Sequence, residues 1–229
     1  MPLKENRSRR SFLASGLAGL GGGALGAGIL APRAEAEDTL PAGRLARKRV
    51  LIASGEFGES LETYYLKYRL EEEGATAVVA APKAKRLQLV VHDFEAGYDG
   101  YTEKLGYGIQ AEIAYRDVDP AAFQGLLLPG GRAPEEIRLE EDLIRVVRHF
   151  LDRKLPVGAM CHGVMVLYTA RPIQGRTLTA YQGIRPDIEL LGGKFVDREV
   201  VVDGNIVTSR GWPDLPAFAR EFLKLLAAR

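Results

Sequence analysis

The chain has 229 residues, of which 46% are hydrophobic and 27% charged, as in a globular protein with one domain and a sizeable core. Its net charge of +1, without a basic run in the body of the chain, excludes a nucleic-acid binder. A single cysteine excludes an intramolecular disulfide. With only three histidines (His92, His149 and His162), none at ligand spacing, we expect neither a metal site nor a cofactor.

The first 36 residues have the features of an export signal. Arg9-Arg10 precedes an uncharged, glycine-rich stretch at 11–32, and an A-x-A cleavage site follows at 34–36. This pattern resembles a bacterial twin-arginine signal, which implies a folded protein delivered to the periplasm or secreted, with membrane contact only during export. An uncleaved N-terminal anchor is the alternative, because the uncharged stretch is long enough to span a bilayer.

After a polar leader at 37–48, the first half of the domain at 49–229 alternates apolar runs with helical spacing. The pattern predicts a strand at 49–54, a helix at 60–73 that Gly74 ends, and a strand at 76–81. The segment 83–103 is rich in Gly and Tyr, which predicts a surface insertion with a short strand at 87–91. Another strand is expected at 111–115.

The second half of the domain continues the alternation. The pattern predicts strands at 123–128 and 155–160, helices at 140–153 and from Cys161 to about Ala170, a hairpin at 198–209 that turns at Asp203-Gly204, and a helix from Leu215. Such alternation predicts a parallel sheet covered by helices on both faces, with the functional loops at the carboxyl ends of the strands.

Cys161 is the strongest candidate for chemistry. It follows a buried strand and precedes a helix, with the small residues Ala159 and Gly163 on either side, as in a nucleophile elbow. The positive end of the following helix is expected to favour the thiolate. The alternative is a buried structural cysteine, since free thiols are often packed in cores.

Several motifs resemble the PfpI branch of the ThiJ/PfpI superfamily. They are Leu128–Glu135 as a glycine-rich loop, Ala159–Gly163 as the elbow, Tyr181-Gln182-Gly183-Ile184, and the late hairpin Glu199–Asn205 followed by Ser209-Arg210. The resemblance covers about residues 49–228. It implies an α/β, flavodoxin-like three-layer sandwich with a mostly parallel sheet, similar to class I glutamine amidotransferases.

The resemblance also implies a set of site residues. His162 would assist Cys161, Glu135 would act from a neighbouring subunit, and Glu62 would act from the start of the first helix. The backbone N–H groups of Gly131 and His162 would form an oxyanion hole. Each carboxylate has a plainer alternative, since Glu62 and its neighbour Glu59 could simply favour a helix N-terminus, and Glu135 could be a solvated helix start.

Aromatic residues near these motifs are weaker candidates. Tyr181 is a candidate for substrate binding, although a packing role is the alternative. Trp212 and the tyrosines at 98, 101 and 107 could line the rim of a pocket or cover the core, and we favour the core.

Three functions remain open. The first is a cysteine-dependent hydrolase of the PfpI type that acts on peptides or a similar acyl compound. The second is glyoxalase or deglycase chemistry on a small carbonyl substrate, which needs the same cysteine and carboxyl group. The third is a redox-sensing stress protein or chaperone without turnover. If Glu135 acts on a neighbouring subunit, the protein is at least a homodimer.

Overall fold

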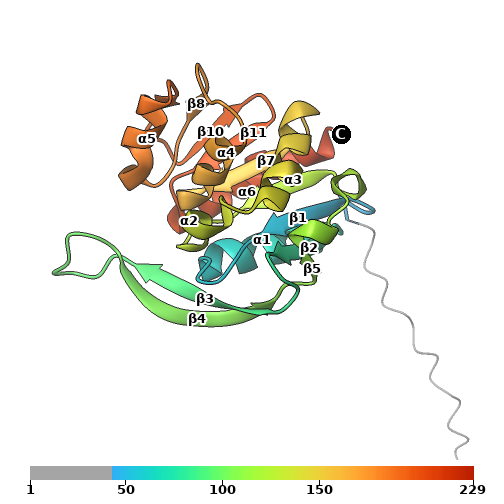
Figure 1. The fold of residues 1–229 in the computed structure, drawn as a ribbon, viewed down its shortest axis with the longest axis horizontal. Helices are drawn as coiled ribbons and strands as arrows, with labels where there is room; N and C mark the ends of the chain where they lie inside the picture. Colours follow the sequence, from blue (N-terminus) through green and yellow to red (C-terminus); the bar gives the residue numbers. More distant parts are fainter. Residues whose placement is uncertain (1–42) are drawn as a thin grey trace, which may run out of the picture. The chain divides into compact units, whose positions relative to one another are not determined.

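The computed structural model describes residues 43–229 (Figure 1). The expected export signal and the first part of the leader lie outside the described residues. Within 43–229, no helix is long and apolar enough to cross a membrane.

A seven-stranded sheet forms the centre of the domain, in the order β10-β11-β7-β6-β1-β2-β5. All neighbouring strands are parallel except β10 and β11, which form the predicted antiparallel hairpin. The strands are β1 (Arg49–Ala53), β2 (Thr76–Ala81), β5 (Ile113–Ala114), β6 (Gly125–Leu128), β7 (Val157–Met160), β10 (Val200–Asp203) and β11 (Ile206–Ser209). The chain builds outward from β1 in one direction and then returns to its other side with β6, so a topological switch point lies between β1 and β6.

Helices cover both faces of this sheet, which confirms the flavodoxin-like sandwich (Figure 1). Alternate residues of β1 point to opposite faces: Leu51 packs with the core under α3 and α4, whereas Ile52 packs with the core under α1 and α6. The helices are α1 (Ser60–Glu72), α2 (Ala133–Ile137), α3 (Glu141–Asp152), α4 (Val164–Ala170), α5 (Arg185–Leu190) and α6 (Leu215–Ala227). A small separate sheet pairs β8 (Thr177–Leu178) with β9 (Lys194–Phe195).

The insertion is more regular and longer than predicted. It forms an antiparallel hairpin of β3 (Arg86–Asp93) and β4 (Thr102–Gln110), which packs along α1 and forms a sheet of its own (Figure 1). The sequence predicted only the middle of β3. It missed β4 because Gly106 and Gly108 disfavour a strand. A side chain at Gly106 would lie 2.1 Å from the Ser60 hydroxyl oxygen, so the close packing of hairpin on helix requires glycine there.

The predicted glycines lie where two other elements end, whereas the predicted bounds of several elements differ by up to three residues. Gly74 has a φ of +84° where α1 ends, and Gly204 has a φ of +62° in the turn between β10 and β11. The short helix α2, which carries Glu135, was not predicted as a helix. The domain therefore presents the carboxyl ends of β1, β6 and β7 side by side, and the loops that follow them build the site.

Candidate active site

Cys161 lies at a strained turn directly after β7. Its φ is +52°, a conformation that is uncommon for a residue with a side chain. A 3-10 turn at Cys161–Gly163 leads into α4, and a side chain at Gly163 would lie 2.0 Å from the Leu128 carbonyl oxygen. The predicted nucleophile elbow is therefore present, and strain of this kind, about 1–3 kcal/mol, is typical of functional sites.

Glu62 is the carboxyl group that faces the cysteine. It is fully buried in the first turn of α1, accepts a 2.5 Å hydrogen bond from the Gly130 backbone N–H, and lies beside Cys161, which is among the groups that lower its pKa. Burial, reinforced by the charge of Glu59, raises the pKa of Glu62 to about 8. Glu59 instead caps α1 by accepting the Glu62 backbone N–H at 2.7 Å. Of the two carboxylates weighed from the sequence, Glu62 is the one at the sulfur, and it is largely protonated at neutral pH.

The Cys161 thiol differs from the sequence-based expectation in its protonation. Cys161 is only 2% exposed. Burial, together with the nearby charge of Glu62, raises the pKa of the thiol well above its usual value. The backbone N–H groups of Gly131 and His162 favour the thiolate, but they do not outweigh burial. The helix was expected to bias the group toward the anion. That expectation was wrong, because it took no account of desolvation.

His162 lies beside the sulfur, with its Nδ1 atom 3.4 Å from Cys161 Sγ. Burial, and then the nearby His92, lower the pKa of His162 to about 4, so the imidazole is neutral at pH 7. Its ring packs against Tyr181, with 4.8 Å between the ring centroids. A neutral imidazole at this position can accept the thiol proton when a substrate is attacked.

The depressed pKa of His162 predicts a pH-dependent loss of stability. Unfolding returns the imidazole to a pKa near 6.5, so the unfolded chain binds more protons between pH 6.5 and 4. The folded state therefore loses up to about 3 kcal/mol as the pH falls through this range, a contribution that His162→Gln removes. Urea unfolding of the wild type and of His162→Gln at pH 7 and pH 4.5 measures this loss in the free energy of unfolding. A difference between the two proteins that stays constant with pH would contradict the burial of a neutral imidazole.

The glycine-rich loop after β6 brings backbone donors to the sulfur. Gly131 has a φ of +81°, and a side chain there would lie 2.4 Å from the Glu59 backbone nitrogen. Phe57, in the loop after β1, also has a positive φ (62°), and its carbonyl oxygen accepts the Arg132 N–H at 2.9 Å. The two loops thus hold each other, with Gly131 fixed against the cysteine.

Gly130 fills the space between the nucleophile and the carboxyl group. A Cβ atom there would lie 2.5 Å from Cys161 Cβ and 3.0 Å from both Cys161 Sγ and Glu62 Oε2. We expect Gly130→Ala to reduce the free energy of unfolding by about 1–3 kcal/mol, because backbone or buried atoms must move. Gly100→Ala is the control, since nothing lies within 4 Å of its added carbon, and it should stay within about 0.5 kcal/mol of wild type. Equal urea midpoints for the two variants would refute this packing.

Glu135 is not brought to Cys161 within one chain. It is exposed in the first turn of α2, and among residues 43–229 no hydrogen bond joins it to His162. Its charge does reach Tyr101, where it contributes to a raised pKa. A role for Glu135 on a neighbouring subunit remains a prediction.

The hairpin insertion contributes to the site, which is the less favoured of the two roles considered for its tyrosines. Tyr101, next to β4, packs edge-on against Tyr181 and His162, with centroid distances of 5.4 and 6.2 Å. Phe94 stacks on Trp212 at 5.2 Å. Trp212 packs against the core, as expected, and also lines the pocket at the edge of the site. Tyr101 instead lies against His162 at the edge of the site, 60 positions before Cys161 in the sequence.

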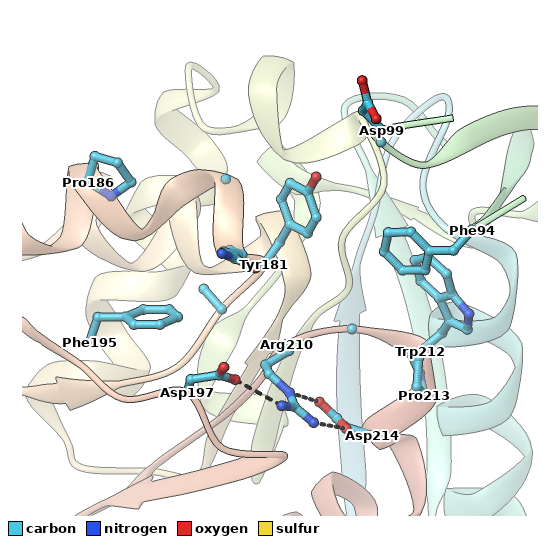
Figure 2. Close-up of a pocket in the computed structure, with 15 residues that line it drawn as sticks. Phe94, Asp99, Tyr181, Pro186, Phe195, Asp197, Arg210, Trp212, Pro213 and Asp214 are labelled. Atoms are coloured by element: carbon cyan, nitrogen blue, oxygen red, sulfur yellow. Dashed lines mark hydrogen bonds and ion pairs between the residues drawn. The ribbon is translucent and has the colours of Figure 1, made fainter. Parts of the chain in front are cut away.

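An open pocket of about 710 Å³ adjoins this aromatic group (Figure 2). Tyr181 lines one side, and Phe94 with Trp212 lines the other. At its base, Arg210 forms ion pairs with Asp214 and Asp197, both at 2.8 Å (Figure 2). In the described part of the chain, no group of three or more metal-ligating side chains lies together. Tyr181 joins this pocket to His162, whereas Cys161, His162 and Glu62 do not line it.

The fold and the site together define an α/β sandwich with a cysteine on a nucleophile elbow at the carboxyl edge of its parallel sheet. The sequence pattern of the DJ-1/PfpI family matches residues 48–225, and the chain belongs to this family. It is 40% identical over 179 residues to Deglycase PfpI of Pyrococcus furiosus, which covers 78% of this chain and 99% of the relative. It is 36% identical over 162 residues to General stress protein 18 of Bacillus subtilis, which covers 70% of this chain and 94% of the relative.

A solved structure supports the same fold. The crystal structure of Drosophila melanogaster DJ-1beta superposes with a TM-score of 0.66 at 22% identity, over 79% of this chain and 91% of that one. At this identity the likeness concerns the fold alone.

Proposed function

We propose that the protein converts a small 2-oxoaldehyde such as methylglyoxal, free or bound to an amine, into a 2-hydroxy acid, with Cys161 as nucleophile. The observation that carries this proposal is the enclosure of the reacting groups. Cys161 is 2% exposed, beside a fully buried Glu62 whose pKa is about 8. A carboxyl group with this pKa can donate a proton and then accept one near neutral pH, as movement of a proton between two adjacent carbons requires.

The first steps form a covalent adduct. An amine adduct first loses its amine, which takes the hydroxyl proton and restores the aldehyde C=O. Cys161 Sγ then bonds to the aldehyde carbon, and the electron pair of the C=O π bond moves to the oxygen. That oxygen takes a proton from Glu62, and the thiol proton passes to His162. The Glu62 carboxylate then removes the hydrogen of the former aldehyde carbon, and His162 protonates the neighbouring oxygen, which gives an enediol thioether.

The last steps release the product. Glu62 delivers its proton to the neighbouring carbon, and His162 takes the hydroxyl proton from the carbon bonded to sulfur, which leaves a thioester. Water attacks the thioester, its proton returns to Glu62, and the sulfur leaves with the proton held by His162. For methylglyoxal the product is lactic acid, and the site returns to its starting state without an oxidant or reductant.

The competing hypotheses have less support. A polypeptide substrate needs an open cleft at the nucleophile, whereas here His162, Tyr181 and Tyr101 pack together beside the buried Cys161. The name of the relative Deglycase PfpI also favours the carbonyl reaction over a peptidase. A redox sensor needs an exposed thiolate, and burial raises the pKa of this thiol.

The test is lactate formation by the full-length protein. Methylglyoxal and, separately, its adduct with N-acetyllysine are incubated with the protein, and the lactate formed is measured enzymatically. Digestion of casein by the same protein is measured in parallel. We expect lactate from methylglyoxal and no casein cleavage. Casein cleavage without lactate would replace the proposal with the peptidase.

Two further proposals concern assembly and location. We propose a homodimer or larger assembly in which Glu135 approaches His162 of a neighbouring subunit. Mixed assemblies of Cys161→Ser and Glu135→Gln chains should then regain activity that neither variant has alone.

We also propose export by the twin-arginine route. Fusion of residues 1–42 to a folded reporter should place it in the periplasm, and replacement of Arg9 and Arg10 by lysine should stop this.

A further inference from the structure

The strongest feature outside the predicted site is the tyrosine that the hairpin carries to it. Tyr101 is half-buried, and its ring contacts His92, His162 and Tyr181, with 4.3, 6.2 and 5.4 Å between centroids. Among residues 43–229, no group hydrogen-bonds to its hydroxyl. A phenol held on three sides by aromatic rings, with its hydroxyl free, is available to a ligand.

A chain of charged and polar contacts fixes this tyrosine relative to the elbow. The His92 ring lies against Tyr101, and its Nε2 atom is 2.9 Å from a Glu103 carboxylate oxygen. Glu103 also accepts from Arg132 Nε at 2.9 Å. Arg132 follows Gly131, whose backbone N–H favours the Cys161 thiolate. The hairpin is therefore tied to the same loop that holds the backbone donors, although their sequence positions are about thirty residues apart.

The hydroxyl is within electrostatic reach of the sulfur. Burial raises the pKa of Tyr101 to about 12, and the next largest cause is the charge of Cys161. Tyr101 thus stays protonated at neutral pH and acts only as a hydrogen-bond donor or acceptor, not as a base.

A 2-oxoaldehyde has two adjacent oxygens, and the site described so far provides for one. The Gly131 and His162 N–H groups favour negative charge on the sulfur, so they are the donors expected to stabilise the oxygen of the attacked carbon as it gathers charge. The neighbouring keto oxygen requires a second donor on the hairpin side. We propose that Tyr101 contacts the substrate and donates a hydrogen bond to this keto oxygen. This assignment rests on the proposed function and identifies the substrate feature that the insertion recognises.

The test measures adduct formation rather than turnover. Full-length protein is alkylated at Cys161 with iodoacetamide at initial rates, and protection by methylglyoxal is compared with protection by propanal, which lacks the keto oxygen. We expect Tyr101→Phe, which keeps the ring, to weaken protection by methylglyoxal by about 10-fold and to leave protection by propanal unchanged. Tyr98→Phe is the matched control. It lies on the same hairpin tip, is 67% exposed, and should behave as wild type with both aldehydes.

The outcomes separate this assignment from the proposed function. Equal protection of wild type and Tyr101→Phe by methylglyoxal, or equal weakening with both aldehydes, would overturn the assignment even where lactate is formed. Wild-type protection that depends on Tyr101, without any lactate, would remove the proposed reaction and leave the keto-oxygen contact standing. Absence of protection in the wild type would overturn both.

Discussion

Replacement of Cys161 by serine should lower lactate formation from methylglyoxal by about a thousand-fold or more. Serine keeps the size and the strained backbone of the elbow, where φ is +52°, so the fold is expected to remain. The hydroxyl is a much weaker nucleophile than sulfur, and the adjacent groups are poorly suited to deprotonate it. The pKa of His162 is only about 4, and Glu62 is largely protonated at neutral pH.

The measurement compares kcat of the two proteins, with thermal unfolding and circular dichroism as controls for the fold. Because the chain has one cysteine, no other thiol can substitute for the missing one. Lactate formation by Cys161→Ser at more than a tenth of the wild-type rate would show that the carbonyl chemistry occurs elsewhere.

Glu62→Gln should separate turnover from the reactivity of the sulfur. Glutamine can still accept the Gly130 N–H, which lies 2.5 Å from the Glu62 carboxyl oxygen, so the packing is preserved. It cannot carry a proton between two carbons, and we therefore expect kcat to fall by about 10²–10⁴-fold at pH 7.

Alkylation of Cys161 should respond in the opposite direction. In the wild type, ionisation of Glu62 near pH 8 adds a negative charge that raises the thiol pKa. Glutamine removes this charge, so above pH 8 the variant should be alkylated faster than the wild type.

The control is Glu71→Gln, which lies on the solvent side of the same helix, where its ion pair with Lys67 is exposed. It should change neither kcat nor alkylation. If Glu62→Gln turned over methylglyoxal as fast as wild type, the carboxyl group would have no part in the proton transfer.

Sequence periodicity predicted most of the fold because the responsible forces are local. The apolar run at β1, the helix at α1 and its glycine end are each specified within a few residues, as is the hairpin turn, which lies at Gly204-Asn205, one residue after the predicted position. Strand β4 was missed because its glycines have a tertiary cause. Gly106 leaves room for Ser60, and the Gly108 carbonyl oxygen accepts a 2.8 Å hydrogen bond from the Tyr64 hydroxyl.

The sequence predicted which residues lie around Cys161, apart from Glu135 and Tyr101, but not their protonation. Cys161, His162, Glu62 and Gly131 meet as the motif resemblance implies. The protonated thiol was not predicted, because desolvation depends on how completely α1 and the glycine-rich loop cover the sulfur. Tyr101 was missed for a related reason, since only the long hairpin brings it to His162.

The most direct test of Cys161 as the nucleophile compares the extent of its alkylation with the remaining activity. Full-length protein is alkylated by iodoacetamide to increasing extents, the fraction of labelled chains is counted by intact mass, and lactate formation is measured in each sample. If Cys161 is the nucleophile, activity should fall in proportion to labelling and reach zero at one label per chain. Activity that persists in fully labelled protein would contradict the assignment of Cys161 as the nucleophile.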